Sequence, residues 1–349
     1  MPGLPEDHER FARAALGAYG RAPDTPLRLL SLSENATYLV GDVGGDEGCD
    51  DEPVVLRVHR PGYHSVEEIR SELDWMAALR TQTSVRTPEL VPTVTGEPVT
   101  AAHVGDRMLY VDAVSYIAGC TAEEDPDVVG FDALGELTAI MHQHVQSWTA
   151  PAHFTRFRWD LDAILGPHAR WGDWRAAHAL TASDRAVIER AATEITGRLT
   201  EFGMDPDRFG LVHADLRLAN LMVDPNAPES GITVIDFDDC GWSWHLADLG
   251  AVVSWIEDTP AAERIVSDWL SGYLTRRPLP PEDLAMIPTF VMLRRIHLTA
   301  WTASHHDADA AIAVGPEFAT GTAALAHRYL DEPDWLAEAI ARADQHATR

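Results

Sequence analysis

The stretch that decides the fold is residues 211–240, LVHADLRLANLMVDPNAPESGITVIDFDDC. Short apolar runs at 211–212, 221–223 and 232–235 predict buried strands. Asp215, Asn220 and Asp236 stand close to where these runs end. Carboxylates at the mouth of buried strands are costly unless something binds them. Oxygen ligands of this type suit a hard cation, and Mg²⁺ typically takes one or two carboxylates together with substrate phosphates.

The spacing of these polar residues has a chemical meaning. His213-Ala-Asp215 is followed after four residues by Asn220, and Asp236-Phe-Asp238 follows the next apolar run. Kinases use H-R-D-x-x-x-x-N and D-F-G in this order, with an acid for the substrate hydroxyl and an amide and a second acid for the metal. A structural turn capped by Asp and Asn is the alternative for either half alone. The two halves together, in this order, favour phosphoryl transfer.

The stretch resembles the aminoglycoside phosphotransferase-like family, the small-molecule branch of the protein-kinase-like fold. That family commonly carries His-Gly-Asp-Leu-His-x-x-Asn and then Ile-Asp-Phe/Trp. Here Ala214 replaces the Gly and Arg217 replaces the second His, and the ending is similar to the homoserine-kinase and stress-response-kinase side of the family. The resemblance implies a two-lobed α+β kinase-like fold. Its β-rich N-lobe would span residues 1–116, and its mainly helical C-lobe residues 117–349.

The resemblance also implies roles for the residues of this stretch. Asp215 would orient or deprotonate the acceptor hydroxyl, and Asn220 and Asp236 would hold Mg²⁺. Asp238 is a candidate for assisting a second metal ion. Asp248, in an Asp-Leu pair after the stretch, would support the catalytic loop.

Residues 27–32 and 37–43 predict two strands, and the segment between them includes Ser33, Glu34 and Asn35. A kinase places its phosphate-covering loop at this point. The segment lacks G-x-G-x-x-G, but Ser and Asn tolerate tight turns and offer side-chain donors. A plain hairpin turn is the alternative to a phosphate-binding loop.

Residues 53–59 predict a strand whose alternation puts Val54, Leu56 and Val58 on one face and Arg57 on the other. Arg57 is the candidate for gripping the nucleotide phosphates, where kinases usually have Lys. Arg offers a bidentate fork to phosphate and stays charged. We expect Arg57 to face a cleft and to contact few core atoms. An exposed residue on an edge strand is the alternative.

A helix is predicted to begin after Ser65, because Ser65 and Glu68 form a capping-box pattern. Glu72 lies at the edge of its apolar stripe and is the candidate partner of Arg57, as the corresponding Glu is in kinases. A solvated Glu72 is the alternative. Strand-like runs follow at 90–95, 98–102 and 107–115, and Tyr116 and Ile117 then begin a predicted hinge where adenine would meet backbone groups.

The remaining chain is predicted to be mainly helical, after an opening helix at residues 6–19. Its expected helices are 131–148, 181–202, 246–257, 261–274, 282–304, 323–329 and 335–341. Residues 149–178 mix aromatic and basic side chains, which suits either a core segment or the wall of a substrate cleft.

The composition sets limits on partners and compartment. The 349 residues carry a formal net charge of −28, which argues against nucleic-acid binding. The acidity is compatible with a cationic substrate, although it more often serves solubility. Three widely spaced cysteines give no disulfide framework. Without a signal peptide or a run of 18 uncharged apolar residues, we expect a cytoplasmic protein with no membrane contact.

The sequence thus predicts an ATP- and Mg²⁺-dependent kinase that phosphorylates a hydroxyl of a small molecule. An aminoglycoside or other antibiotic, an amino-acid alcohol and a sugar all remain possible acceptors. A Ser/Thr protein kinase of the stress-response type is one alternative, although no A-P-E segment follows Asp236-Phe-Asp238. A catalytically inactive nucleotide-binding module is the other.

Overall fold

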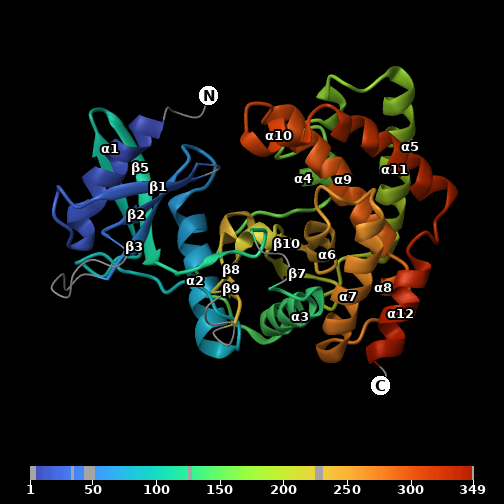
Figure 1. Cartoon of the computed structure of the whole chain (residues 1–349), viewed down its shortest axis with the longest axis horizontal. Helices are drawn as coiled ribbons and strands as arrows, with labels where there is room; N and C mark the ends of the chain where they lie inside the picture. The colour runs from blue at the N-terminus through green and yellow to red at the C-terminus, as the bar shows by residue number, and fades with distance from the viewer. Residues whose placement is uncertain (1–4, 33–34, 43–51, 125–127, 225–230, 348–349) are drawn as a thin grey trace. The chain divides into compact units, whose positions relative to one another are not determined.

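The computed structural model describes residues 5–32, 35–42, 52–124, 128–224 and 231–347. The chain divides into two compact units. The first comprises residues 1–120 with the segments 150–156 and 222–238, and the second comprises 121–149, 157–221 and 239–349. Two segments from later in the sequence therefore complete the N-terminal unit. Elements of both units are labelled in Figure 1.

The first unit is built on a five-stranded antiparallel sheet with the order β1-β2-β3-β5-β4. Its strands are β1 (Leu27–Leu32), β2 (Asn35–Val40), β3 (Val54–His59), β4 (Val99–Val104) and β5 (Arg107–Ser115). Strand β3 lies at the centre of the sheet, and Arg57 pairs with Asp112 of β5 in the register. Arg57 is therefore not on an edge strand.

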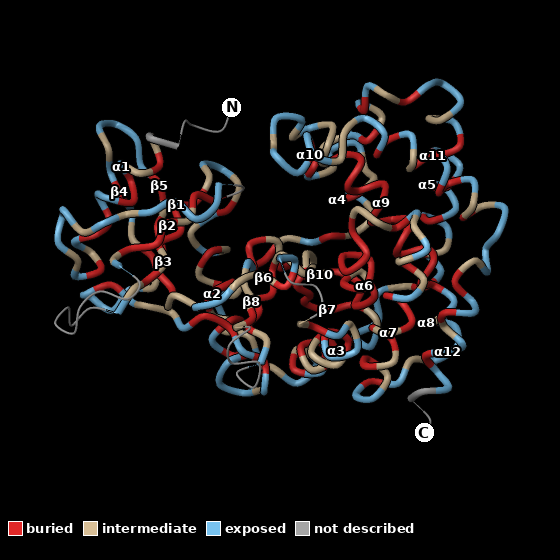
Figure 2. The backbone as a smooth tube through the Cα atoms, viewed as in Figure 1, coloured by how far each residue is buried: buried red, intermediate tan, exposed pale blue. Residues whose placement is uncertain are grey.

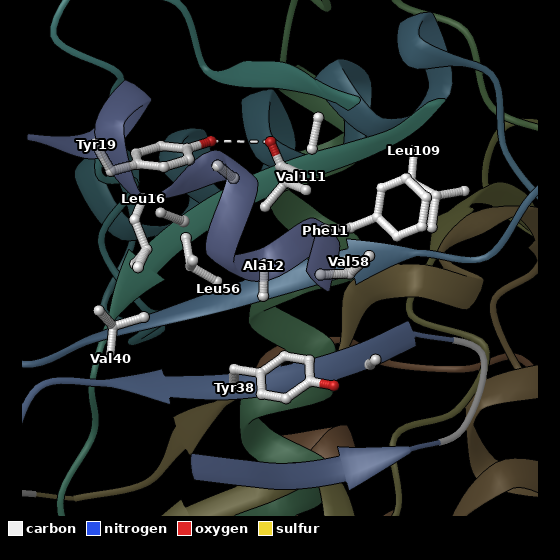
Figure 3. Close-up of a cluster of buried hydrophobic side chains, with 14 of the residues drawn as sticks. Phe11, Ala12, Leu16, Tyr19, Tyr38, Val40, Leu56, Val58, Leu109 and Val111 are labelled. Atoms are coloured by element: carbon white, nitrogen blue, oxygen red, sulfur yellow. Dashed lines mark hydrogen bonds between the residues drawn. The ribbon is translucent and has the colours of Figure 1, made fainter. Parts of the chain in front are cut away.

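One face of this sheet is covered by α1 (Pro5–Ala15) and the short helix η1 (Leu16–Tyr19). Val54, Leu56 and Val58 all belong to the hydrophobic cluster beneath these helices, which confirms the predicted alternation (Figure 3). The hydroxyl of Tyr19 donates a 2.9 Å hydrogen bond to the backbone oxygen of Val111. The apolar side chains fill this face, so Arg57 points to the other one.

Helix α2 (Val66–Gln82) follows β3 and begins with the predicted capping box. The N–H of Ser65 donates to the Glu68 carboxylate at 2.9 Å, and the N–H of Glu68 donates to the Ser65 hydroxyl at 3.2 Å. On its buried side, Trp75 contacts Phe237 edge-on, with ring centroids 5.4 Å apart. This contact holds the segment 222–238 in the first unit.

The second unit is mainly helical. Helices α3 (Phe131–Ser147) and α7 (Pro260–Arg276) pack closely because Gly135 and Gly272 face the other helix. A Cβ at Gly272 would lie 1.8 Å from the backbone oxygen of Asp132. Buried backbone runs through α6 (Ala247–Val252) and α9 (Ile287–Ser304) at the centre of this unit (Figure 2).

The other elements are short strands and helices of various lengths. They are β6 (Cys120–Thr121), α4 (Leu161–Leu165), η2 (Trp174–Ala176), α5 (Ala182–Phe202), β7 (Phe209–Val212), η3 (Leu218–Asn220), β8 (Leu221–Val223), β9 (Thr233–Val234), η5 (Phe237–Asp239), β10 (Gly241–Trp244), α8 (Pro281–Leu284), α10 (Asp309–Val314), α11 (Glu317–Asp331) and α12 (Ala337–Ala347). No helix in the described ranges is both long and apolar enough to cross a bilayer.

Several predicted elements were wrong in extent. Residues 90–95 form no strand, because Pro92 lacks an N–H and Thr93 and Gly96 close a turn. The helix expected at 246–257 ends at Val252, three residues before Trp255 takes a left-handed φ of 74°. The helix expected at 282–304 is two helices, the second with Pro288 in its first turn.

Candidate active site

In the first unit, Arg57 lies at the centre of a buried charge network. Its Nη1 donates to Glu72 at 2.5 Å, and its Nε and Nη2 each donate to one oxygen of Asp112 at 2.9 Å. Arg57 is 8% exposed, and both carboxylate residues are fully buried. The expectation that Arg57 contacts few core atoms is therefore wrong, and so is the alternative of a solvated Glu72.

Asp112 was missed by the sequence analysis, although a lone acid within the apolar run 109–114 was a usable signal. Burial by itself would raise the pKa of the Asp112 carboxyl, but Arg57 and His59 outweigh it, so the pKa is lowered. The Nε2 of His59 lies 2.5 Å from Asp112. The network stays charged because each buried carboxylate has a cationic partner.

Asp238, the candidate for a second metal, is bound by side chains of its own unit. Asn35 donates to its Oδ1 at 2.9 Å, and the Nε2 of His64 lies 3.4 Å from its Oδ2. Arg156 donates to its backbone oxygen. Burial would lower the pKa of His64, but Asp238 and Glu68 outweigh it and raise the pKa to about 9. Asp238 therefore faces an imidazolium at neutral pH.

The other candidate residues of the first unit have different surroundings. Asp236 is exposed and takes a left-handed φ of 61°. Tyr116 and Ile117 directly follow β5 and are half-buried. Ser33 and Glu34 lie outside the described residues. Of the predicted nucleotide residues, the structure brings Arg57 and Glu72 together and places Asn35 on Asp238.

In the second unit, the carboxylate of Asp215 is held through both oxygens. Arg294 donates to Oδ1 at 2.5 Å, while Arg217 and Asn220 donate to Oδ2 at 3.1 and 2.9 Å. Burial would raise the pKa of Asp215, but Arg217 and Arg294 outweigh it and lower the pKa. Asp215 is consequently an ionised acceptor with a fixed orientation. Arg217, the departure from the family pattern, is one of the groups that fix it.

Arg294 was missed because nothing near it in the sequence marks it as a site residue. It lies in α9, 79 residues after Asp215. Its Nε donates to the Ser254 hydroxyl at 2.9 Å and its Nη1 to the backbone oxygen of Ala214 at 3.1 Å. Three separate bonds thus fix this guanidinium beside the candidate base.

Asp248 holds the backbone of the same loop. Its carboxylate accepts from the N–H of Ala214 at 2.7 Å and of His213 at 3.3 Å, and it lies 3.0 Å from His142 Nε2. Burial raises the pKa of Asp248 to about 6. These backbone contacts match the supporting role that the family resemblance implied for this residue.

His142 completes this support. Arg277 donates to the Tyr273 hydroxyl at 2.6 Å, and that hydroxyl lies 2.9 Å from His142 Nδ1. Because Arg only donates, the Tyr273 proton points to Nδ1, which leaves Nε2–H to donate to Asp248. Burial lowers the pKa of His142 well below its usual value, so the ring is neutral.

Ala214 has a strained backbone, since its φ is 67°. A left-handed conformation costs a non-glycine residue roughly 1–2 kcal/mol. We therefore expect Ala214→Gly to raise the free energy of unfolding by about 1 kcal/mol, after the greater entropy of an unfolded Gly is subtracted. Urea denaturation measures this gain. Ala285→Gly is the control: Ala285 is exposed and has a right-handed φ of −65°, so this change should lower stability.

The model of the family described as "Phosphotransferase enzyme family" matches residues 27–280. The chain belongs to this family. As a phosphotransferase, it has the predicted fold class, with a β-rich N-lobe and a helical C-lobe.

Among solved structures, the phosphotransferase is similar to a microcompartment-associated aminopropanol kinase, with 43% identity and a TM-score of 0.83 over 92% of this chain and 97% of the other. It is also 26% identical over 303 residues to the amicoumacin kinase of Bacillus subtilis (strain 168), covering 82% of each chain. The GDP complex of aminoglycoside 2'-phosphotransferase-IIIa shares the fold, with 15% identity and a TM-score of 0.55 over 98% of this chain and 99% of the other.

The comparisons confirm that the protein is a small-molecule phosphotransferase. The alternative of an inactive nucleotide-binding module is set aside, because the family and the relatives of this phosphotransferase are enzymes. A small substrate is likewise favoured over a protein substrate.

Proposed function

We propose that this phosphotransferase transfers the γ-phosphate of ATP to the hydroxyl of a small amino alcohol. The observation that carries the chemistry is the half-buried Asp215 carboxylate, held ionised by Arg217 and Arg294. The substrate class follows from the 43% identity to an aminopropanol kinase. The net charge of −28 suits a substrate that carries an ammonium group. ATP as the donor fits a cytoplasmic enzyme.

In this mechanism Asp215 accepts a hydrogen bond from the acceptor hydroxyl and takes its proton as the phosphoryl group is transferred. Its lowered pKa keeps it ionised, so it can both orient the hydroxyl and accept its proton. Arg294, Arg217 and Asn220 fix the two oxygens, and Asp248 fixes the loop that carries them.

We assign the metal to Asn220 and Asp236. The side-chain amide nitrogen of Asn220 donates to Asp215, and its Oδ1 accepts no hydrogen bond within the described residues. This oxygen is therefore available as a ligand for a hard cation. Asp236 contributes an exposed carboxylate. A bound Mg²⁺ would neutralise charge on the transferred phosphate. Asp238 is assigned to the network of Asn35 and His64 instead, because those groups occupy its carboxylate.

Nucleotide binding is assigned to the first unit. Arg57 has five N–H groups and uses three of them on Glu72 and Asp112, which leaves two for phosphate oxygens. Glu72 then acts as a positioning residue for Arg57. Tyr116 and Ile117 offer backbone groups after β5 for the adenine. Ser33, Glu34 and Asn35 complete this proposed set as the phosphate-covering loop.

A substrate panel tests the proposal. ATP consumption is measured with 1-amino-2-propanol, ethanolamine, choline, an aminoglycoside and a Ser-containing peptide. We expect phosphorylation of the amino alcohols with the highest kcat/KM, and 1,2-propanediol, which lacks the amine, should be a poor acceptor. Preferred turnover of the aminoglycoside or of the peptide would overturn the substrate assignment.

Asp236→Ala should weaken the Mg²⁺-dependent binding of ATP, because it removes a charged ligand from the metal. Calorimetric titration with ATP, with and without Mg²⁺, measures the effect. Asp224→Ala is the comparison, since Asp224 is half-buried and is assigned no ligand role. Equal affinity and equal metal dependence in Asp236→Ala and the wild type would contradict the assignment of Asp236.

A further inference from the structure

A small cavity of about 30 Å³ lies beside the catalytic loop in the second unit. Its walls include Ala214 of that loop, Arg294 and His297 of α9, and the indole rings of Trp159 and Trp171. Ala247 and Ile164 also border it. The volume has room for one or two groups the size of a water molecule or a methyl group.

The cavity is adjacent to the proposed base. Ala214 directly precedes Asp215, and Arg294 both borders the cavity and donates to Asp215 at 2.5 Å. A reacting hydroxyl must come within hydrogen-bond reach of Asp215, at about 2.6–3.2 Å. A substituent on the carbon that bears this hydroxyl is therefore within reach of the cavity.

The charge at the walls disfavours a cation. The Arg294 guanidinium lies 5.5 Å from the Trp171 ring, and the Arg170 guanidinium lies 5.5 Å from the Trp159 ring. His297 stacks on Trp171 at 3.9 Å, and burial, Arg294 and Arg170 lower its pKa well below the usual value. An ammonium group would meet the Arg294 guanidinium there, and no acidic residue lines the cavity.

An alkyl group meets no such penalty. The indole rings, Ile164 and Ala247 give it apolar contact. Two of the polar wall groups are already hydrogen-bonded: Arg294 makes three hydrogen bonds, and the Ser243 hydroxyl donates to the backbone oxygen of Trp159 at 2.9 Å. His297 is stacked on Trp171 and lies edge-on to Trp159 at 5.0 Å, and its Nε2 has no hydrogen-bond partner within the described residues. The cavity thus suits a small neutral substituent.

We propose that this cavity binds the short alkyl substituent on the hydroxyl-bearing carbon of the acceptor. The enzyme then prefers a secondary amino alcohol to a primary one, and one enantiomer to the other, because the cavity lies to one side of the reacting carbon. The ammonium group points away from the cavity. This inference rests on the proposed amino-alcohol kinase activity.

The test compares kcat/KM for ethanolamine and for both enantiomers of 1-amino-2-propanol. One methyl group in an apolar pocket changes kcat/KM by roughly 10- to 200-fold, and we expect the wild-type enzyme to prefer one enantiomer over ethanolamine by an amount in this range. Ala247→Leu fills the cavity and should remove most of that preference. Ile164→Ala enlarges the cavity and should shift the preference toward 1-amino-2-butanol.

For each variant, the kcat/KM values for the different substrates are measured on one preparation and compared as ratios. A partial loss of folded enzyme lowers every value by the same factor and cancels from the ratio. Ala337→Leu is the control, because Ala337 borders a different groove, on α12, and the change should leave the ratios as in the wild type. Wild-type ratios in both Ala247→Leu and Ile164→Ala would overturn the cavity assignment. If no amino alcohol is phosphorylated at all, it is the proposed function that fails, and the two failures are distinguishable.

Discussion

Asp215→Asn is expected to lower kcat by roughly 10²- to 10⁴-fold, the typical cost of removing a general base. The Asn side chain keeps the shape of Asp, but it cannot take the hydroxyl proton, and it leaves Arg294 and Arg217 without their carboxylate partner. The KM for ATP should change little, because nucleotide binding is assigned to other residues. Steady-state kinetics at saturating ATP and amino alcohol measure both quantities.

Asp205→Asn is the matched control, because Asp205 is an exposed residue of the same unit, and its kcat should equal that of the wild type. Circular dichroism and urea denaturation of Asp215→Asn exclude unfolding as the cause of the loss. Wild-type turnover by folded Asp215→Asn would contradict the assignment of Asp215.

Arg57→Ala is expected to lower the free energy of unfolding by about 3–5 kcal/mol, the usual cost of breaking a buried ion pair from one side. The reason is that Glu72 and Asp112 are fully buried and would each lose a charged partner. Urea denaturation measures the change. Activity must then be compared only between variants that are folded at the assay temperature.

Arg57→Lys and Glu72→Gln separate nucleotide binding from stability. Lys keeps a positive charge but loses the two-point contact with Asp112, so kcat/KM for ATP should fall only in part. The loss of kcat/KM for ATP in the double variant, expressed as a free energy, should be smaller than the sum of the losses in the two single variants. Residues that contact each other show such non-additivity. Strict additivity would show that Glu72 does not position Arg57. Arg264→Ala, which breaks an exposed pair with Asp268, should lower the free energy of unfolding by less than about 1 kcal/mol.

The sequence by itself determined the features that depend on neighbours along the chain. Alternation placed Val54, Leu56 and Val58 on the core face, and the Ser65–Glu68 pattern set the start of α2. The spacing of His213, Asp215, Asn220 and Asp236, with the family resemblance, indicated a small-molecule kinase. Such patterns are readable because a strand or a helical turn relates residues only two to four positions apart.

The tertiary structure decided which groups surround each candidate. The partner of Arg57 on the neighbouring strand is 55 residues away, Arg294 comes from 79 residues beyond Asp215, and Asn35 lies 203 residues from Asp238. A buried charge requires a partner of opposite sign or a hydrogen bond. Which residue becomes that partner depends on how the chain folds, because the partners are far apart in the sequence. For this reason the sequence singled out Asp215 and Arg57 as candidates, whereas only the fold showed what holds each of them.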